Sequence, residues 1–293
     1  MMPRIKHMLR TYLRSRGLDI VRVAGVSDHS VLPAENLVDH LFSVGKEKFT
    51  ALLVPVEDLT WDDGFSLDPA GWNPYLKTAS EYLRGTATSY ETSSLHAFYA
   101  AFSPATAAEY LATSLPGNGP LSLIPAGSYI LPWSLVSPEE RFLDRKRQNT
   151  EEELVASTPF SNRRNMRGLN KMGPVSYEKG RLEFSRLTRL VDSIRTKGYA
   201  RSLGTDIEVV ALRHRGELRY VVASGFHRSA VLAALGFRSI PVVLKPRLIV
   251  DSDLLLAGPA VRNGYWSREE VLAYLDFLFE ERGLDRARAL GLV

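Results

Sequence analysis

The segment Val221–Leu244 constrains the fold of this chain more than any other stretch. It reads VVASGFHRSAVLAALGFRSIPVVL, with apolar runs at both ends and small residues at helical spacing between them. This pattern predicts a strand, a tight turn, a helix and a second strand in succession. Such an order favours a domain in which helices pack against a sheet.

Gly225 stands where the first predicted strand meets the helix, and this junction is a candidate anion site. The start of a helix exposes backbone N–H groups and the positive end of the helix dipole. Glycine lets a ligand approach the main chain closely. His227 and Arg228 add a hydrogen-bonding ring and a fixed positive charge, so the junction predicts a phosphate site. The alternative is that Arg228 only caps the helix or pairs with a carboxylate.

The flanking sequence extends this unit on both sides. Residues 183–199 predict an amphipathic helix. Residues 206–224 predict two strands joined by a short turn at Gly216. Further on, Ser267 with Glu270 three positions later forms a capping box, which predicts the start of another helix.

The predicted fold class is α+β, with a boundary between two regions near residue 150. Residues 151–293 are expected to form a small mixed sheet with flanking helices. Residues 1–150 are expected to form a mainly helical region of unknown function. Within it, one helix is predicted to direct four apolar side chains to the core, namely Leu95, Phe98, Tyr99 and Phe102.

Composition excludes some classes of chemistry and leaves others open. The 293 residues include no cysteine, which excludes disulfides, thiolate metal sites and a cysteine nucleophile. The net charge of +4 permits a phosphorylated ligand, an anionic membrane or nucleic acid, and selects none of them. No apolar run approaches the roughly 20 residues that span a bilayer, and no secretory signal is visible, so a cytoplasmic protein is expected.

Two basic segments lie outside the strand–helix–strand unit. The first is the N-terminal stretch from Arg4 to Arg16, a basic amphipathic helix that could lie on an anionic membrane surface, such as the inner membrane face, or dock on its own domain. The second is a run that has no acidic residue from Ser157 to Val175 and whose five basic residues are Arg147, Arg163, Arg164, Arg167 and Lys171. It could hold phosphates or be a solvated basic loop.

The segment ASGFHRSAVLAALGFRSIPVVL resembles the ParB/sulfiredoxin superfamily. In that superfamily a strand ends in a Gly-x-x-Arg box, an Ala-rich helix follows, and a Leu-Gly turn leads to an Ile-Pro-Val strand. The resemblance covers about residues 173–245 and leaves residues 1–150 uncovered. The residues that carry it are Gly225, His227, Arg228, Ala230, Ala233, Ala234, Leu235, Gly236, Ile240, Pro241 and Val242.

The resemblance implies a nucleotide, ATP or CTP, bound together with Mg²⁺. It assigns five residues to the phosphates: Ser224, Gly225, His227, Arg228 and Ser229. Arg262 and Asn263 match, loosely, a later segment that completes the nucleotide pocket. Because the family has a glutamate where Arg262 stands, CTP hydrolysis of the ParB kind is not expected. Phe226 occupies the place of the reactive cysteine of sulfiredoxins, so repair of sulfinic acids is excluded.

Serine-kinase members of the superfamily use a glutamate as general base, and the resemblance suggests Glu178 or Glu183 for this role. The alternative is that both glutamates only occupy the first turns of a helix, where its dipole favours them. No residue is predicted as a metal ligand.

The leading functional prediction is therefore a phosphotransferase or nucleotidase that acts on a small molecule. The stretch YETSSLHAFYAAFSPATAAE is similar to bacterial proteins met near surface-polysaccharide genes, which suggests an envelope-glycan precursor as acceptor. One alternative is a nucleotide-regulated binding module without turnover. The other alternative is a ParB-like nucleic-acid-binding protein. The sequence disfavours it, because no carboxylate cluster of the kind that a nuclease needs is visible and too few residues follow Trp266 for a DNA-reading domain.

Overall fold

A six-stranded mixed sheet organises the protein, in the order β1-β2-β6-β4-β5-β3. The computed structural model describes residues 31–33, 51–113, 119–156, 171–201 and 206–293. The strands are β1 (Val31–Pro33), β2 (Ala51–Pro55), β3 (Leu59–Thr60), β4 (Ile207–His214), β5 (Glu217–Ser224) and β6 (Ser239–Asp251). The α-helices are α3 (Pro74–Arg84), α4 (Ser94–Ala101), α5 (Ala107–Tyr110), α6 (Pro138–Ala156), α7 (Tyr177–Lys197), α8 (Phe226–Ala234), α9 (Ser252–Leu256), α10 (Pro259–Arg262), α11 (Arg268–Glu280) and α12 (Leu284–Ala289).

The strand–helix–strand unit predicted from Val221–Leu244 is confirmed as β5, α8 and β6. Strands β4 and β5 form an antiparallel hairpin. Its turn residues Arg215 and Gly216 both have positive φ, 50° and 85°, as the twist of a two-residue hairpin requires. Strand β6 then runs parallel to β4, and β5 followed by α8 makes the long connection that a parallel pair needs.

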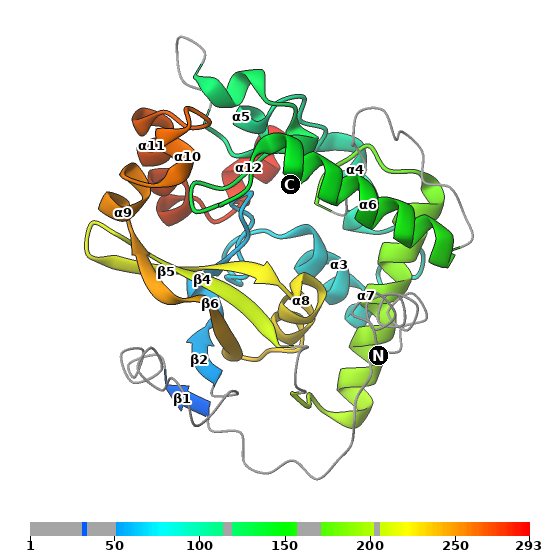
Figure 1. Cartoon of the computed structure of the whole chain (residues 1–293). Helices are drawn as coiled ribbons and strands as arrows, with labels where there is room; N and C mark the ends of the chain where they lie inside the picture. Colours follow the sequence, from blue (N-terminus) through cyan, green and yellow to red (C-terminus); the bar gives the residue numbers. More distant parts are fainter. Residues whose placement is uncertain (1–30, 34–50, 114–118, 157–170, 202–205) are drawn as a thin grey trace, which may run out of the picture.

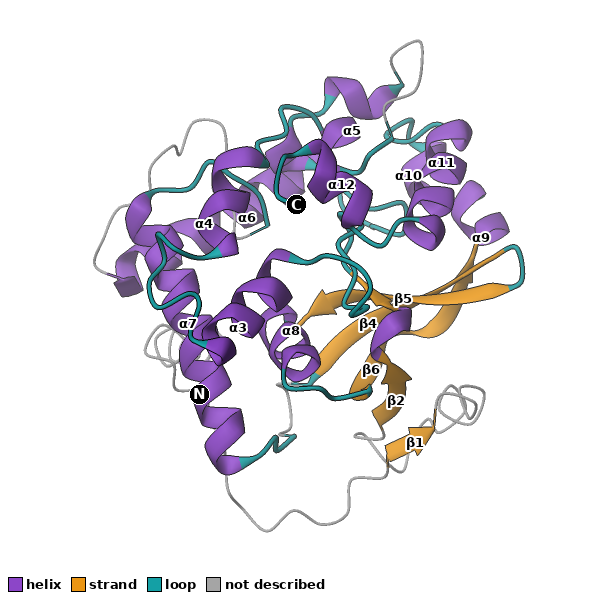
Figure 2. Ribbon diagram, turned by 180° about the vertical axis from the view of Figure 1, so that it is seen from behind, coloured by secondary structure: helices purple, strands orange, loops and turns teal. Residues whose placement is uncertain are grey.

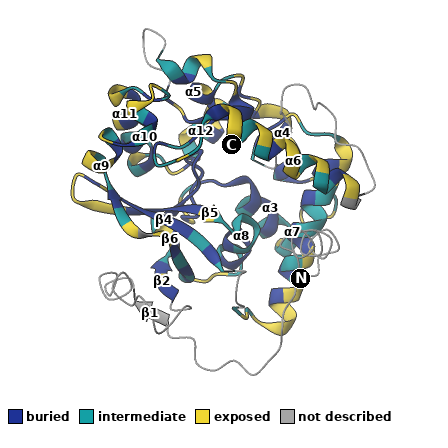
Figure 3. Cartoon of the chain, viewed as in Figure 1, coloured by how far each residue is buried: buried dark blue, intermediate teal, exposed yellow. Residues whose placement is uncertain are grey.

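Helices gather in two groups around the sheet (Figure 1). Helices α3, α4, α7 and α8 contact one another on one side of the sheet. Helices α9, α10 and α11 lie at the far end of the β4–β5 hairpin, and the reverse view in Figure 2 shows the same separation. The central strands β4 and β5 are largely buried (Figure 3).

Helix ends follow the capping chemistry that the sequence carries. Ser267 accepts a hydrogen bond from the Glu270 N–H while the Glu270 side chain accepts one from the Ser267 N–H, so the predicted capping box is confirmed. Helix α7 begins earlier than predicted, because the Ser176 side chain accepts a hydrogen bond from the Lys179 N–H and caps it there. In the first half of the chain, the Asn73 side chain caps α3.

The two-region division expected near residue 150 does not match this architecture. Residue 150 lies inside α6, and strands β2 and β3 from the first half complete the sheet beside β6 and β5. One hydrophobic core joins both halves, with the Trp61 and Phe226 rings 5.1 Å apart. The first half is therefore not only helical: its short strands find their partners in the second half.

Other expectations about the first half hold or lie outside the described residues. The four side chains assigned to one helix face, Leu95, Phe98, Tyr99 and Phe102, are buried as predicted. The basic N-terminal stretch and the arginines at 163, 164 and 167 fall outside the described residues, so membrane contact stays a prediction. Among the described helices, none has both the length and the apolarity that crossing a bilayer demands.

Candidate functional site

The junction of β5 with α8 has the glycine-dependent geometry that the sequence predicts. Gly225 caps α8 in the left-handed region, with φ 88° and ψ 27°. A Cβ atom at this position would lie 3.0 Å from Ile207 Cγ1 and 3.1 Å from Ile207 Cα. Both the backbone conformation and this close approach therefore require glycine.

The other residues assigned to the phosphates differ in where they point. Arg228 stays beside the turn, and its Nη2 lies 3.4 Å from the Asp206 carbonyl oxygen. His227 turns to Glu183, with 2.8 Å between His227 Nε2 and Glu183 Oε2. The Ser229 hydroxyl is buried and donates to the Phe226 carbonyl at 2.9 Å. Within the first turn of α8, Arg228 is thus the side chain that remains near Gly225.

Glu183 lies in a largely buried group of charges that we call the Glu183 cluster, made of Glu152, Lys179, Glu183 and Arg186. Lys179 Nζ and Arg186 Nη1 lie 2.8 and 2.7 Å from Glu183 Oε1. Glu152 on α6 also pairs with Lys179 and Arg186. Although burial opposes ionisation, Lys179 and Arg186 hold the pKa of Glu183 well below its usual range. The cluster and His227 together tie α6, α7 and α8 to one another.

The remaining predicted site residues are not brought to the β5–α8 turn. Glu178 is exposed in the first turn of α7. Arg262 and Asn263 are exposed at the end of α10, in the helix group at the other end of the sheet (Figures 1 and 2). The structure therefore unites Gly225, Arg228 and, through His227, Glu183.

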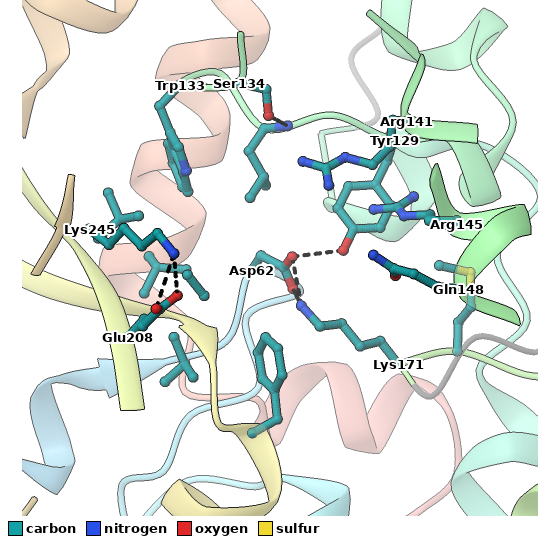
Figure 4. Close-up of a pocket in the computed structure, with 17 residues that line it drawn as sticks. Asp62, Tyr129, Trp133, Ser134, Arg141, Arg145, Gln148, Lys171, Glu208 and Lys245 are labelled. Carbon is teal, nitrogen blue, oxygen red and sulfur yellow. Dashed lines mark hydrogen bonds and ion pairs between the residues drawn. The ribbon is translucent and has the colours of Figure 1, made fainter. Parts of the chain in front are cut away.

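A cavity of about 550 Å³ opens next to the turn (Figure 4). The turn contributes Ala223 and Phe226 to its lining, and the faces of β4 and β5 contribute Val210, Val221 and Val222. Helix α6, the segment 129–134, Asp62, Lys171, Met172, Glu208 and Lys245 complete the wall.

One wall of the cavity, which we call the α6 wall, consists of Arg141, Arg145 and Gln148. Their spacing of four and three residues places them on one face of the helix. Arg145 is only 8% exposed. Its Nη1 donates to the Gly127 carbonyl at 2.8 Å, and its guanidinium lies 3.8 Å from the centre of the Tyr129 ring.

The positive charge of the α6 wall has no carboxylate partner among the described residues. No Asp or Glu oxygen in that part of the chain lies within ion-pair distance of Arg145 or Arg141. The Arg141 Nε is buried and finds no hydrogen-bond acceptor there. Burial lowers the pKa of Arg145, as expected for a cation removed from water.

Asp62 lies at the centre of the close-up and is fully engaged (Figure 4). Lys171 Nζ lies 2.9 Å from each of its oxygens. The hydroxyls of Tyr110 and Tyr129 donate to it at 3.1 and 2.8 Å. Burial opposes its ionisation, but Lys171 holds the pKa of Asp62 below its usual value. Asp62 thus fixes Lys171, whose ammonium also lies 3.8 Å from the centre of the Phe226 ring.

Asp63, the next residue, differs from Asp62 in its partners and in the direction of its pKa shift. Its Oδ1 accepts a hydrogen bond from the Phe65 N–H at 3.2 Å, whereas its Oδ2 is buried and has no partner among the described residues. Burial, and then the negative charge of Asp62, raise the pKa of Asp63 to about 7. The two adjacent carboxyl groups therefore have pKa values shifted in opposite directions, and of the two only Asp62 has a cation bonded to its side chain.

The side of the cavity opposite the α6 wall carries the ring of Trp133 and one ion pair. Figure 4 shows Trp133, Glu208 and Lys245 on this side, and Arg141, Arg145, Gln148 and Lys171 on the other. Lys245 Nζ lies 3.1 Å from both oxygens of Glu208. Among the described residues, no group of three or more His, Asp or Glu side chains is placed to hold a metal ion.

Comparisons with known proteins returned nothing: no family model, no curated protein and no solved structure matches this chain. The resemblance of Val221–Leu244 to the ParB/sulfiredoxin superfamily therefore stays a prediction, and function has to be argued from the cavity.

None of the nine residues predicted for phosphate binding, the nucleotide pocket or catalysis lines the cavity, and the sequence pointed only to the adjacent turn. Arg141, Arg145 and Gln148 stand in a helix of mixed charge, and their common face was a signal that periodicity could have found. Trp133 lies in a Pro- and Gly-rich connection, and Asp62 lies in a turn. Neither position carries a pattern that points to a site, because only the fold brings them to the β5–α8 turn.

Proposed function

We propose that the protein binds a nucleoside triphosphate, ATP or CTP, in the cavity beside the β5–α8 turn. The observation that carries this proposal is Arg145, a buried guanidinium that faces the cavity and has no carboxylate partner among the described residues. A buried charge without a counter-ion is costly. A bound anion would supply the missing negative charge.

Phosphate groups fit the charge of the cavity as a whole. Its lining includes four cationic side chains, Arg141, Arg145, Lys171 and Lys245, but only two carboxylates, Asp62 and Glu208. Arginine binds phosphate through two parallel N–H groups, which gives both strength and orientation. The amino end of α8, where Phe226 lines the cavity, adds its dipole to the same field.

The size of the cavity also suits a nucleotide. Small-molecule sites usually measure about 300–1,000 Å³ and are mostly apolar with a few directed polar groups. The volume of about 550 Å³ and the wall of valines on β4 and β5 agree with that description. The resemblance of Val221–Leu244 to a nucleotide-binding superfamily supports the same ligand class.

Phosphoryl transfer to a small-molecule acceptor, such as an envelope-glycan precursor, is the catalytic form of this proposal. Glu183 is enclosed by cations and Glu178 is exposed on α7, so neither lies on the cavity wall. Both carboxylates that do line it, Asp62 and Glu208, are in ion pairs. This observation favours the second candidate function, a nucleotide-regulated binding module without turnover.

Calorimetric titration of ATP and CTP tests the proposal, with Mg²⁺ and with a chelator in separate runs. We expect Arg141→Met and Arg145→Lys each to weaken binding by about 10-fold or more, since a charge-assisted hydrogen bond contributes roughly 1.5–3 kcal/mol. Lys146→Met is the matched control, because Lys146 is exposed on the same helix. Equal loss in the control, or no binding by the unaltered protein, would refute the proposal. Product analysis in the same samples separates turnover from binding alone.

A further inference from the structure

We infer that the Trp133 side of the cavity recognises the base of the nucleotide, and that Glu208 favours a base with an amino group at its edge. This inference rests on the proposed nucleotide site. It adds an orientation to that site, with the phosphates at the α6 wall and the base at the opposite side. Figure 4 shows these two groups of side chains facing each other across the cavity.

Trp133 offers a fixed and partly exposed ring for stacking. The turn that carries it is closed by two hydrogen bonds, from Ser134 N–H to the Leu131 carbonyl at 2.8 Å and from Leu131 N–H to the Ser134 hydroxyl at 3.1 Å. Behind it, the Tyr274 ring lies 6.3 Å away, centre to centre. Tyr274 is itself buried, and its hydroxyl donates to the Asp62 carbonyl at 2.9 Å. A ring held in this way can stack on any base, so it provides affinity without selecting among bases.

The Glu208–Lys245 pair supplies the groups that can distinguish one base from another. Glu208 and Val210 both belong to β4, and both line the cavity. The carboxylate can only accept hydrogen bonds, and the ammonium can only donate them. Because a carboxylate has more acceptor sites than the single ammonium uses, Glu208 can still accept a hydrogen bond from a ligand.

The exposed fractions of Glu208 and Lys245 indicate which of the two charges acts more strongly on a bound base. The Lys245 side chain is 68% exposed, whereas that of Glu208 is 31% exposed. Water screens the charge of Lys245 more strongly, and Glu208 is the deeper group. An amino group placed against Glu208 would donate to it, whereas a keto oxygen in the same place would be repelled. Cytosine differs from uracil, and adenine from hypoxanthine, by this exchange of an amino group for a keto group.

The experiment measures the affinities of CTP, UTP, ATP and ITP for the unaltered protein and for Glu208→Gln. We expect CTP to bind more tightly than UTP, and ATP more tightly than ITP, by about 5-fold or more, which is the low end of a hydrogen-bond discrimination. Glu208→Gln should bring both ratios close to one, because an amide can present either its oxygen or its NH₂ group. Glu217→Gln is the matched control, since Glu217 is an exposed carboxylate at the other end of the same hairpin.

The outcomes separate the two proposals. Equal affinities within both pairs, together with a loss of binding in Arg141→Met, would overturn the base assignment and leave the nucleotide site standing. No binding of any of the four nucleotides would overturn both. Ratios that persist in Glu208→Gln would show that another group reads the base.

Discussion

Two clusters of charge meet helix α6, and they differ in how their charges are balanced. In the Glu183 cluster, two carboxylates face two cations, and Glu183 makes contacts of 2.8 Å or less with Lys179, Arg186 and His227. On the α6 wall, Arg141 and Arg145 have no carboxylate partner among the described residues. The Glu183 cluster links three helices through ion pairs, whereas the α6 wall leaves positive charge for which we propose a bound anion as the partner.

The largest effect on stability is expected when Glu183 is removed from the Glu183 cluster. Glu183→Ala would leave Glu152 as the one carboxylate of the cluster for Lys179 and Arg186, and removal of one partner from a buried ion pair typically costs about 3–5 kcal/mol. We therefore expect urea unfolding to show a loss of that size. Glu178→Ala, on the exposed side of the same helix, should change stability by less than about 0.5 kcal/mol. A stable Glu183→Ala protein that had lost only turnover would instead support the catalytic role first predicted for this residue.

Asp63 extends the comparison to a buried acid. Arg141 and Arg145 are cations without a carboxylate partner among the described residues, and Asp63 is a carboxyl group without a bonded cation there. In the unfolded chain its carboxyl group ionises near pH 4, whereas in the folded protein it keeps its proton until about pH 7. As pH rises between these values, the unfolded state releases this proton first, so the group lowers the free energy of unfolding until about pH 7 and has a constant effect above it.

The test of this linkage is Asp63→Asn, compared with the unaltered protein by thermal or urea unfolding from pH 4 to pH 8. The difference in stability should change by on the order of 3 kcal/mol across that range and favour the variant at the alkaline end. A pH-independent difference would contradict the raised pKa. Asp253→Asn, at an exposed carboxylate on α9, is a control from another part of the fold.

Removal of Arg145 should weaken nucleotide binding and change stability little, whereas removal of Glu183 should mainly lower stability. Arg145→Met deletes a buried charge that no carboxylate balances in the described residues, so the ligand-free protein should lose little stability, about 1 kcal/mol or less. Binding of ATP or CTP should weaken by roughly 10- to 100-fold. Unfolding and calorimetric titration on the same preparation measure both quantities. A large loss of stability without any effect on binding would place Arg145 with the structural charges.

The last prediction concerns Trp133, on the side of the cavity opposite the α6 wall. Trp133→Ala should weaken nucleotide binding by about 1–3 kcal/mol, the usual contribution of a base stacked on an aromatic ring. Inorganic pyrophosphate lacks a base, so its affinity should not change. Competition of pyrophosphate with CTP, measured in both proteins, checks this difference. A parallel loss for both ligands would mean that Trp133 maintains the shape of the cavity instead of contacting the base.

Local sequence patterns anticipated the parts of the fold that depend on neighbouring residues. Val221–Leu244 does form a strand, a helix and a strand, Gly225 adopts the left-handed conformation, and Ser267 with Glu270 forms the capping box. The division near residue 150 failed because β2 and β3 are very short and find partners only in the distant strands β6 and β5. No local periodicity reports a pairing of that kind.

The sequence by itself determined the β5–α8 turn, because a left-handed glycine, a helix start and an adjacent arginine are all local features. Only the tertiary structure decided what lies around that turn. It directed His227 to Glu183 and brought α6, Asp62, Lys171 and Trp133 to the cavity. The physical reason is that balance of buried charge is a property of a whole neighbourhood. Arg145 has acids close to it in the chain, such as Glu140 and Asp144, and only folding decides whether one of them reaches its guanidinium.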